Sequence, residues 1–328
     1  MRKYGLLLPH FGPHASKGAL VGMAPKIEEY GFDSVWVRDH IIFHPHGFED
    51  PDRTHVEPFT VLSAIAAVTE RIQLGFGSLI PHRHPIYTAL ALGSLDWLAG
   101  PGRVIAGFGL GTYDHEFEAI GLGEHDRREL LPEHIEIMRK LWTGEEISYT
   151  GQFYSFEDVD IHPEPVGGEI PVWYCGGSAA SVRRTLEWGL QGWMPGRINL
   201  PSFEKRMERL HDLMEERGIE QMPEISAIPI TSPGSSYEEG ASKVDTEGML
   251  SSARARKWVP GPSGVFEQPR DLDGALIAGT ADDIIESVEK YHELGLQHLV
   301  FDLRNRFAEW PELVAFLAED VLPQVRKA

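Results

Sequence analysis

An acid–base pair, Asp39-His40, ends the second apolar, strand-like run of the chain. An imidazole changes charge near neutral pH, and a neighbouring carboxylate can fix its tautomer and adjust its pKa. Such a pair suits proton transfer to or from a reacting group. The alternative is a polar pair at a helix entrance, but the position at a strand end favours chemistry. We therefore expect His40 to be catalytic and Asp39 to lie in the same ligand site.

Two glycine-containing turns could hold a flat or phosphorylated ligand. Gly75 and Gly77 remove side chains from the end of an apolar run that continues into Ser78. They permit close approach of a ligand to the backbone, or alternatively fit a tight corner of a barrel. The sequence Gly176-Gly177-Ser178 lies between a strand and a helix, where free amides at the helix N-terminus are typical of a phosphate site. Glycine is common in such turns, so the second signal is weak when taken alone.

A histidine-rich loop follows the Asp39-His40 pair and raises the question of a metal. Its candidate ligands are His40, His44, His46, His55, Asp50 and Asp52. A metal-dependent barrel hydrolase would need a histidine pair on its first strand and further histidines on strands five and six. The fifth and sixth runs end instead in Cys175 and Met194. We therefore expect a solvated loop and no metal.

Apolar runs and helix-like segments alternate along almost the whole chain. Strands are expected at 4–9, 32–38, from 72, and at 103–110, 170–175, 190–194, 224–230 and 297–303. Helices are expected at 18–30, 57–69, 86–98, 128–142, 179–188, 202–218, 280–294 and 311–325. Eight such units are typical of a (β/α)8 barrel, with a doubly wound open sheet as the alternative. In a barrel the residues that follow the strands meet at one face.

Two segments interrupt this repeat within what we take to be one domain spanning residues 1–328. Residues 144–168 read as a hairpin and a proline-rich return after the fourth unit. Residues 232–274, after the seventh strand, are rich in Gly, Ser, Pro and charge, which is typical of a mobile lid. The lid carries a basic patch of Arg254, Arg256 and Lys257, which either reaches anionic ligand groups or forms a solvated helix face.

Composition limits the classes of partner. The formal net charge of -20 argues against nucleic acid and against anionic membrane surfaces, which need clustered positive charge. No apolar run approaches the ~20 residues that span a bilayer, and the N-terminal run is too short for a signal peptide. The single cysteine, Cys175, excludes internal disulfides. We expect a soluble cytoplasmic protein that acts on a small molecule.

As an ordered set, the motifs resemble those of the bacterial luciferase-like family of flavin and deazaflavin oxidoreductases. The resemblance runs through Gly31-Phe-Asp-Ser-Val-Trp-Val-Arg-Asp-His40, Arg71-Ile-Gln-Leu-Gly-Phe-Gly-Ser78, Arg83-His-Pro85, Leu95-Asp-Trp-Leu98, Gly100-Pro-Gly-Arg-Val104, Gly109-Leu-Gly111 with Glu116-Phe117 and Gly121, Leu141-Trp-Thr-Gly144 and Gly176-Gly-Ser178. It covers nearly the whole chain. The family fold is a (β/α)8 barrel whose cofactor ring lies at the C-terminal mouth.

The resemblance also implies roles for individual residues. In members that use coenzyme F420, a non-proline cis peptide backs the cofactor ring, and the matching bond here is Gly77–Ser78. His40 matches the active-site histidine beside the cofactor. The turn at Gly176, Gly177 and Ser178 matches the phosphate loop.

The loop after the fourth strand departs from the family pattern. Thr112 stands where the sugar-phosphate dehydrogenases of the family carry a glutamate, which argues against a sugar-phosphate substrate. His115 replaces an asparagine and is expected to reach the cofactor together with Thr112. We further expect Glu116 and Arg127 to form a structural ion pair.

Three functions fit these observations. The first is hydride transfer between coenzyme F420 and a small organic substrate, with His40 as proton donor or acceptor, in a homodimer. The second is an FMN-dependent monooxygenase that uses reduced flavin and oxygen. The third is a flavin-binding protein without catalysis, against which the presence of His40 speaks. The form Val-Trp-Val-Arg-Asp-His and the small residues around Ser78 favour the deazaflavin.

Overall fold

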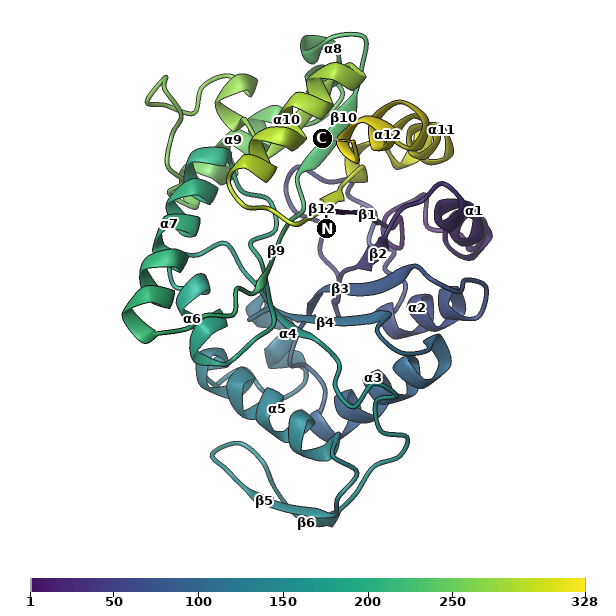
Figure 1. Ribbon diagram of the computed structural model, residues 1–328, viewed down its shortest axis with the longest axis vertical. Coiled ribbons are helices and arrows are strands. Elements are labelled where there is room, and N and C mark those ends of the chain that lie inside the picture. The colour runs from purple at the N-terminus through teal and green to yellow at the C-terminus, as the bar shows by residue number, and fades with distance from the viewer. Residues whose placement is uncertain (1, 328) are drawn as a thin grey trace.

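A closed barrel of eight parallel strands forms the centre of the computed structural model, which describes residues 2–327 (Figure 1). Its strands in chain order are β1 (Lys3–Leu7), β2 (Ser34–Val37), β3 (Gln73–Leu79), β4 (Val104–Phe108), β7 (Val172–Cys175), β8 (Gly192–Met194), β9 (Glu224–Ala227) and β12 (His298–Phe301). They follow one another around the barrel, and β1 pairs with β12 to close it. The (β/α)8 prediction is confirmed, and the open-sheet alternative is wrong.

Helices surround the barrel as the repeat predicted. They are α1 (Ala24–Glu29), α2 (Pro58–Ala66), α3 (Pro85–Ala99), α4 (Asp114–Ala119), α5 (Arg127–Leu141), α6 (Ser181–Glu187), α7 (Leu200–Arg217), α10 (Ala281–Glu293), α11 (Trp310–Phe316) and α12 (Leu322–Val325). Two expected helices, at 18–30 and 311–325, instead contain π-helical turns at Gly18–Gly22 and Leu317–Val321. The local signals explain several ends: α7 stops at Gly218 in the left-handed conformation, and Thr280 caps α10.

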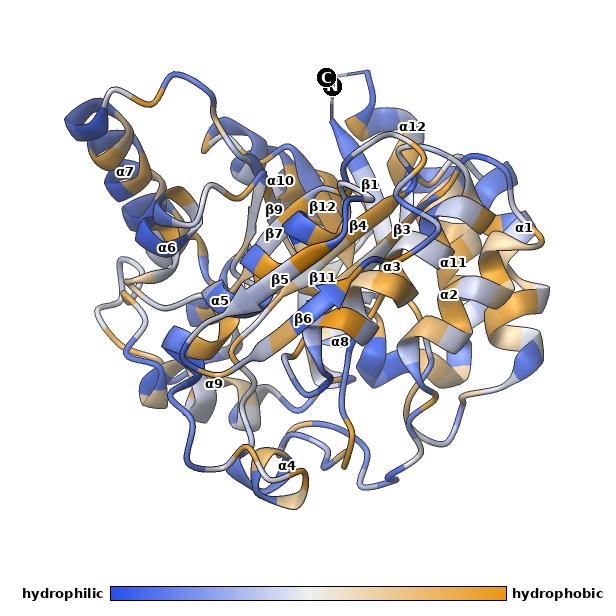
Figure 2. Ribbon diagram, turned by 90° about the horizontal axis from the view of Figure 1, so that it is seen from below, coloured by the Kyte–Doolittle hydropathy of each residue, from blue (hydrophilic) through white to orange (hydrophobic). Residues whose placement is uncertain are grey.

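The barrel interior is filled by large side chains, as in other packed barrels. Trp36 and Trp173 are buried there, with ring centroids 5.4 Å apart. A Cβ atom on Gly75 would lie 2.4 Å from the Trp36 ring. Gly75 is therefore explained by core packing rather than by a ligand. Figure 2 shows the apolar strands inside and a largely hydrophilic α7 at the periphery.

The first insertion is a hairpin, as predicted. Its strands, β5 (Ile147–Thr150) and β6 (Ser155–Val159), pair antiparallel and extend away from the barrel beside α5 (Figure 1).

The second insertion contains more regular structure than the sequence interpretation allowed. The barrel strand β9 ends at Ala227, and β10 (Ile230–Pro233) then pairs in parallel with β11 (Leu276–Gly279). Between them lie α8 (Tyr237–Ser242), α9 (Thr246–Ala255) and a 3-10 helix at Pro269–Leu272. The sequence interpretation assigns no element here apart from the alternative of a helix face at the basic patch, and Arg254 does lie on α9.

The reason is that this insertion has its own core and its own helix caps. Its buried apolar residues, which include Ile230, Met249, Leu250, Leu272 and Leu276, form a separate cluster. The Ser236 and Asp245 side chains accept hydrogen bonds from the third residues of α8 and α9, as N-caps do. Whether the insertion moves as a lid stays a prediction.

Candidate functional site

A cavity of about 230 Å³ lies at the C-terminal ends of the barrel strands. Its lining residues come from seven of the strand ends and from the second insertion: Arg38, His46, Gly77, Ser78, Thr112, Cys175, Gly176, Gly177, Met194, Pro195, Gly196, Arg197, Ile228, Arg256 and Arg304. Five of the residues predicted to bind the cofactor are thus brought together here, namely Gly77, Ser78, Thr112, Gly176 and Gly177.

The peptide bond between Gly77 and Ser78 is cis, as the resemblance implied. A Cβ atom on Gly77 would lie 3.2 Å from Met194 Sδ and 3.3 Å from Ile228 Cδ1. One on Gly109 would lie 2.5 Å from Ser78 Oγ. Both glycines therefore allow this peptide to sit in the wall of the cavity without an intervening side chain.

The carboxylate of Glu116 holds His40. The Nδ1 atom of His40 lies 3.1 Å from Glu116 Oε2. Glu116 Oε1 accepts hydrogen bonds from the backbone N–H groups of Ile41 and Ile42, at 2.9 and 3.1 Å. Burial alone would raise the pKa of Glu116, but the hydrogen bond from His40 and the Ile42 amide outweigh it and lower that pKa. With its Nδ1 proton directed to a carboxylate, His40 keeps Nε2 for proton exchange.

Two predicted pairs are therefore wrong. Asp39 does not contact His40; its two oxygens accept from Arg83 at 2.7 and 2.9 Å, so it anchors the loop after β3. Arg127 pairs with the exposed Asp114 rather than with Glu116. Successive side chains of an extended segment point to opposite sides, which separates Asp39 from its neighbour His40.

Four predicted site residues lie outside the cavity wall. They are Asp39, His40, His115 and Ser178. The ring of His115 lies 4.3 Å from that of His44, and its Nε2 is 3.2 Å from the Ile42 carbonyl oxygen. The Tyr113 ring lies 5.8 Å from the rings of both His40 and His46. Tyr113 therefore connects His40 to a residue that does line the cavity.

The glycine turn after β7 is packed tightly against the end of β8. Gly176 donates its N–H to the Met194 carbonyl oxygen at 2.9 Å. A Cβ atom on Gly177 would lie 2.9 Å from the Pro195 carbonyl oxygen. The helix α6 begins at Ser181, so the turn precedes the helix rather than forming its first turn. Within residues 2–327, the amides of Gly177 and Ser178 donate no hydrogen bond, which leaves two donors for an anion.

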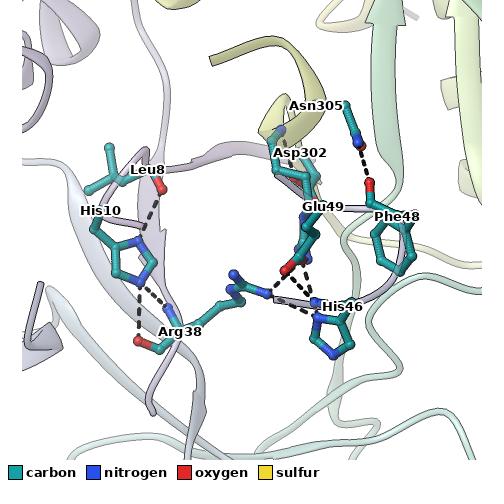
Figure 3. A network of polar contacts seen from close by, with 9 residues as sticks. Leu8, His10, Arg38, His46, Phe48, Glu49, Asp302 and Asn305 are labelled. Carbon is teal, nitrogen blue, oxygen red and sulfur yellow. Dashed lines mark hydrogen bonds and ion pairs between the residues drawn. The ribbon is translucent and has the colours of Figure 1, made fainter. Parts of the chain in front are cut away.

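A network of charged groups around Glu49 supports the arginines of the cavity wall, and sequence reasoning missed it (Figure 3). Glu49 accepts from Arg38 at 2.9 Å and from Arg304 at 2.5 Å. Burial would raise the pKa of Glu49, but these two arginines hold it well below its usual range. The Nε2 atom of His10 accepts the Arg38 backbone N–H at 2.9 Å, so Arg38 is held at both ends.

A signal for this wall was present in the sequence. Arg38, Arg197 and Asp302 all stand at strand ends, where barrel sites lie. Of the predicted basic patch, Arg256 lines the cavity. Arg254 instead binds the Phe266 carbonyl oxygen and Glu247, so it stabilises the insertion.

Two features are absent from residues 2–327. No three His, Cys, Asp or Glu side chains are grouped as they would be around a metal ion. None of the described helices is long and apolar enough to cross a membrane.

Comparison with models of protein families shows which family the chain belongs to. The model of the luciferase-like monooxygenase family matches residues 3–298. This chain belongs to that family. It is 26% identical to an F420-dependent glucose-6-phosphate dehydrogenase of Nakamurella multipartita, over 96% of this chain and 94% of the relative. It is 29% identical to the Nocardia farcinica enzyme of the same name, over 89% and 88%.

Solved structures of low identity share the fold. An F420-dependent secondary alcohol dehydrogenase in complex with an F420–acetone adduct aligns with a TM-score of 0.80 at 18% identity, over 99% of both chains. A type II Baeyer–Villiger monooxygenase from Pseudomonas putida, in complex with FMN, aligns with a TM-score of 0.76 at 18% identity, also over 99% of both chains. The relatives and structures named here are F420-dependent dehydrogenases and a monooxygenase in complex with FMN, and this chain is an oxidoreductase of the same luciferase-like family.

The contact between Glu116 and His40 gives a direct prediction. In Glu116→Ala, His40 loses its acceptor and two backbone amides lose theirs, so we expect the free energy of unfolding to fall by about 1–3 kcal/mol. Neutral His40 should also move its proton from Nδ1 towards Nε2. Urea denaturation measures the first effect, and ¹⁵N NMR of the imidazole measures the second.

The control is Glu118→Ala, which removes an exposed carboxylate from the same helix. It should change stability by less than about 0.5 kcal/mol and leave the tautomer of His40 unchanged. An unaltered tautomer in Glu116→Ala would show that Glu116 does not orient His40.

Proposed function

We propose that this luciferase-like enzyme transfers hydride between coenzyme F420 and a small organic substrate, with FMN as the alternative cofactor. The observation that carries the proposal is one cavity that is lined both by Gly77 and Ser78 and by the turn at Gly176 and Gly177. Full-length relatives named as F420-dependent dehydrogenases support the deazaflavin over the flavin.

The residues present fit such a cofactor. Gly77 and Ser78 offer bare backbone to a flat ring, and the free amides of Gly177 and Ser178 offer donors to a phosphate. Thr112 lines the same cavity, while His115 and Asp39 lie outside its wall. When bound, the cofactor supplies two-electron hydride chemistry.

The protein itself supplies proton transfer and orientation. His40, oriented by Glu116, donates or accepts the proton that accompanies hydride transfer, at its Nε2 atom. Thr112, in place of a glutamate, disfavours the sugar phosphate used by the named dehydrogenases. The substrate is instead another small molecule.

We also propose that the protein is a cytoplasmic homodimer that pairs through α3. Its most exposed large apolar side chains lie on that helix: Tyr87, Trp97 and Leu98 are 57%, 62% and 59% exposed. Grouped exposed apolar side chains on a soluble protein mark interaction sites.

Trp97→Glu tests the homodimer by sedimentation velocity. We expect the wild type to sediment as a dimer and the variant as a monomer, because a charge would be buried at the interface. Val265→Glu places the same charge on an exposed apolar residue of the insertion and should leave the dimer intact. A monomeric wild type would contradict the pairing.

Spectral titration with F420 and, separately, with FMN tests the cofactor. We expect saturable binding of F420, weakened in Gly177→Asp by at least about tenfold more than in Gly177→Ala. Both variants share the steric contact with the Pro195 carbonyl oxygen, so their difference isolates the charge that repels a phosphate. Equal affinity in the two variants would exclude the phosphate turn, and tighter binding of FMN would favour the monooxygenase.

The catalytic role of His40 is tested by His40→Asn. We expect turnover to fall by ~10²–10⁴, with cofactor affinity changed by less than about tenfold. Steady-state kinetics on a substrate found by an F420 absorbance screen measures the first, and titration measures the second. His211→Asn, an exposed histidine on α7, is the control and should turn over normally. Comparable turnover in His40→Asn would remove it from the mechanism.

A further inference from the structure

The cavity wall carries more guanidinium groups than carboxylates. Four arginines line it, and we call them the arginine cluster: Arg38, Arg197, Arg256 and Arg304. The carboxylates of Glu49 and Asp302 form ion pairs with Arg38 and Arg304. They come from three strand ends and from the end of α9. This local excess of positive charge lies in a chain whose formal net charge is -20. Such an excess calls for a ligand of opposite charge.

The Arg38 side chain is buried, and part of its hydrogen-bonding capacity is unused. Its side chain is only 8% exposed, and its Nη1 atom donates to Glu49 at 2.9 Å. Its Nε and Nη2 atoms are buried and have no hydrogen-bond partner. Buried polar groups in folded proteins are nearly always paired, and leaving a charged donor unpaired is costly. Figure 3 shows Arg38 reaching from β2 towards Glu49 and His46.

Arg197 and Arg256 have no counter-charge in contact. The Arg197 guanidinium stacks on the Phe48 ring, 3.9 Å from its centroid. Neither Arg197 nor Arg256 forms an ion pair with any of residues 2–327. Burial, together with repulsion from Arg304 and Arg256, lowers the pKa of Arg197 to about 9. An acceptor at this wall would relieve that repulsion.

The charge of Arg304 is already balanced by two carboxylates, and its contacts fix the position of Glu49. Its guanidinium binds Glu49 and Asp302, and its side chain is 7% exposed. Because Glu49 also binds Arg38, the two arginines are held in fixed relative positions. A preorganised pair of this kind presents its remaining N–H groups without further ordering.

We propose that the arginine cluster binds a carboxylate or phosphate group of the substrate. This deepens the proposed function, on which it rests, by naming the substrate as a small organic anion. Guanidinium groups pair with both kinds of anion through two parallel hydrogen bonds. Within residues 2–327 the amides of Gly177 and Ser178 donate no hydrogen bond and are available to the cofactor phosphate, which leaves the arginine cluster for the substrate. A neutral substrate would leave the charges of Arg197 and Arg256 without a counter-charge and two buried N–H groups of Arg38 unpaired.

Calorimetric titration of cofactor-free protein at low ionic strength tests the proposal. The probes are inorganic phosphate and succinate, which distinguish the two anion types. We expect at least one probe to bind, and to bind at least about tenfold more weakly to Arg38→Gln and to Arg197→Gln. Arg209→Gln, an exposed arginine of α7, should bind the probe like the wild type. Affinity for F420 should change by less than about threefold in all variants.

Several results would overturn the proposal. The anion site is excluded if neither probe binds to the wild type. It is also excluded if Arg38→Gln and Arg197→Gln both bind the probe as tightly as the wild type does. A loss of F420 affinity that matches the loss of probe affinity would assign the arginine cluster to the cofactor. Arg197 has no ion pair to lose, so Arg197→Gln remains informative if Arg38→Gln does not fold. If a probe binds through these arginines but F420 does not bind, the proposed hydride transfer is wrong, while the anion site is still supported.

Discussion

Closure of the barrel by the pairing of β1 with β12 is the constraint on which the rest of this structure depends. It joins the first and last strands, so the loop after β2 meets the segment after β12. Glu49 and Arg304 are 255 positions apart in the chain and yet form a buried ion pair. The same closure places the ends of parallel strands at a single face, where the glycine turn and the arginine cluster face one cavity.

Two parts of the cavity lining differ in chemistry, and each suits a different ligand group. One wall is backbone, made accessible by Gly77 and Gly177, and it suits a flat ring and a phosphate. The other is a set of guanidinium groups fixed by Glu49. The net charge of -20 repels anions at long range, so the arginine cluster attracts them only once they are close to the cavity. His40 stands behind these walls, oriented by Glu116 and connected through Tyr113.

Sequence reasoning recovered the features that are encoded locally. The eight strands were visible because buried parallel strands are continuous apolar runs, and most helix ends carry recognisable caps. The cis bond at Gly77–Ser78 followed from family resemblance rather than from any local rule. The helices α8 and α9 were missed because glycine and serine obscured two ordinary N-caps.

Long-range pairings could not be predicted in the same way. Asp39 stands next to His40, yet its partner is Arg83, and the partner of His40 is Glu116, 76 positions away. Which carboxylate meets which base is set by side-chain direction and by barrel closure, neither of which is written into adjacent residues. The arginine cluster escaped notice for the same reason, although each arginine alone was visible.

The central claim is that one cavity holds F420 between the Gly77–Ser78 peptide and the turn at Gly177. A crystal structure of the protein with F420 tests it most directly. We predict density for the deazaflavin ring against Gly77 and Ser78, with the phosphate accepting hydrogen bonds from the amides of Gly177 and Ser178. A ring bound elsewhere, or a phosphate held by Arg38 and Arg197, would contradict the account.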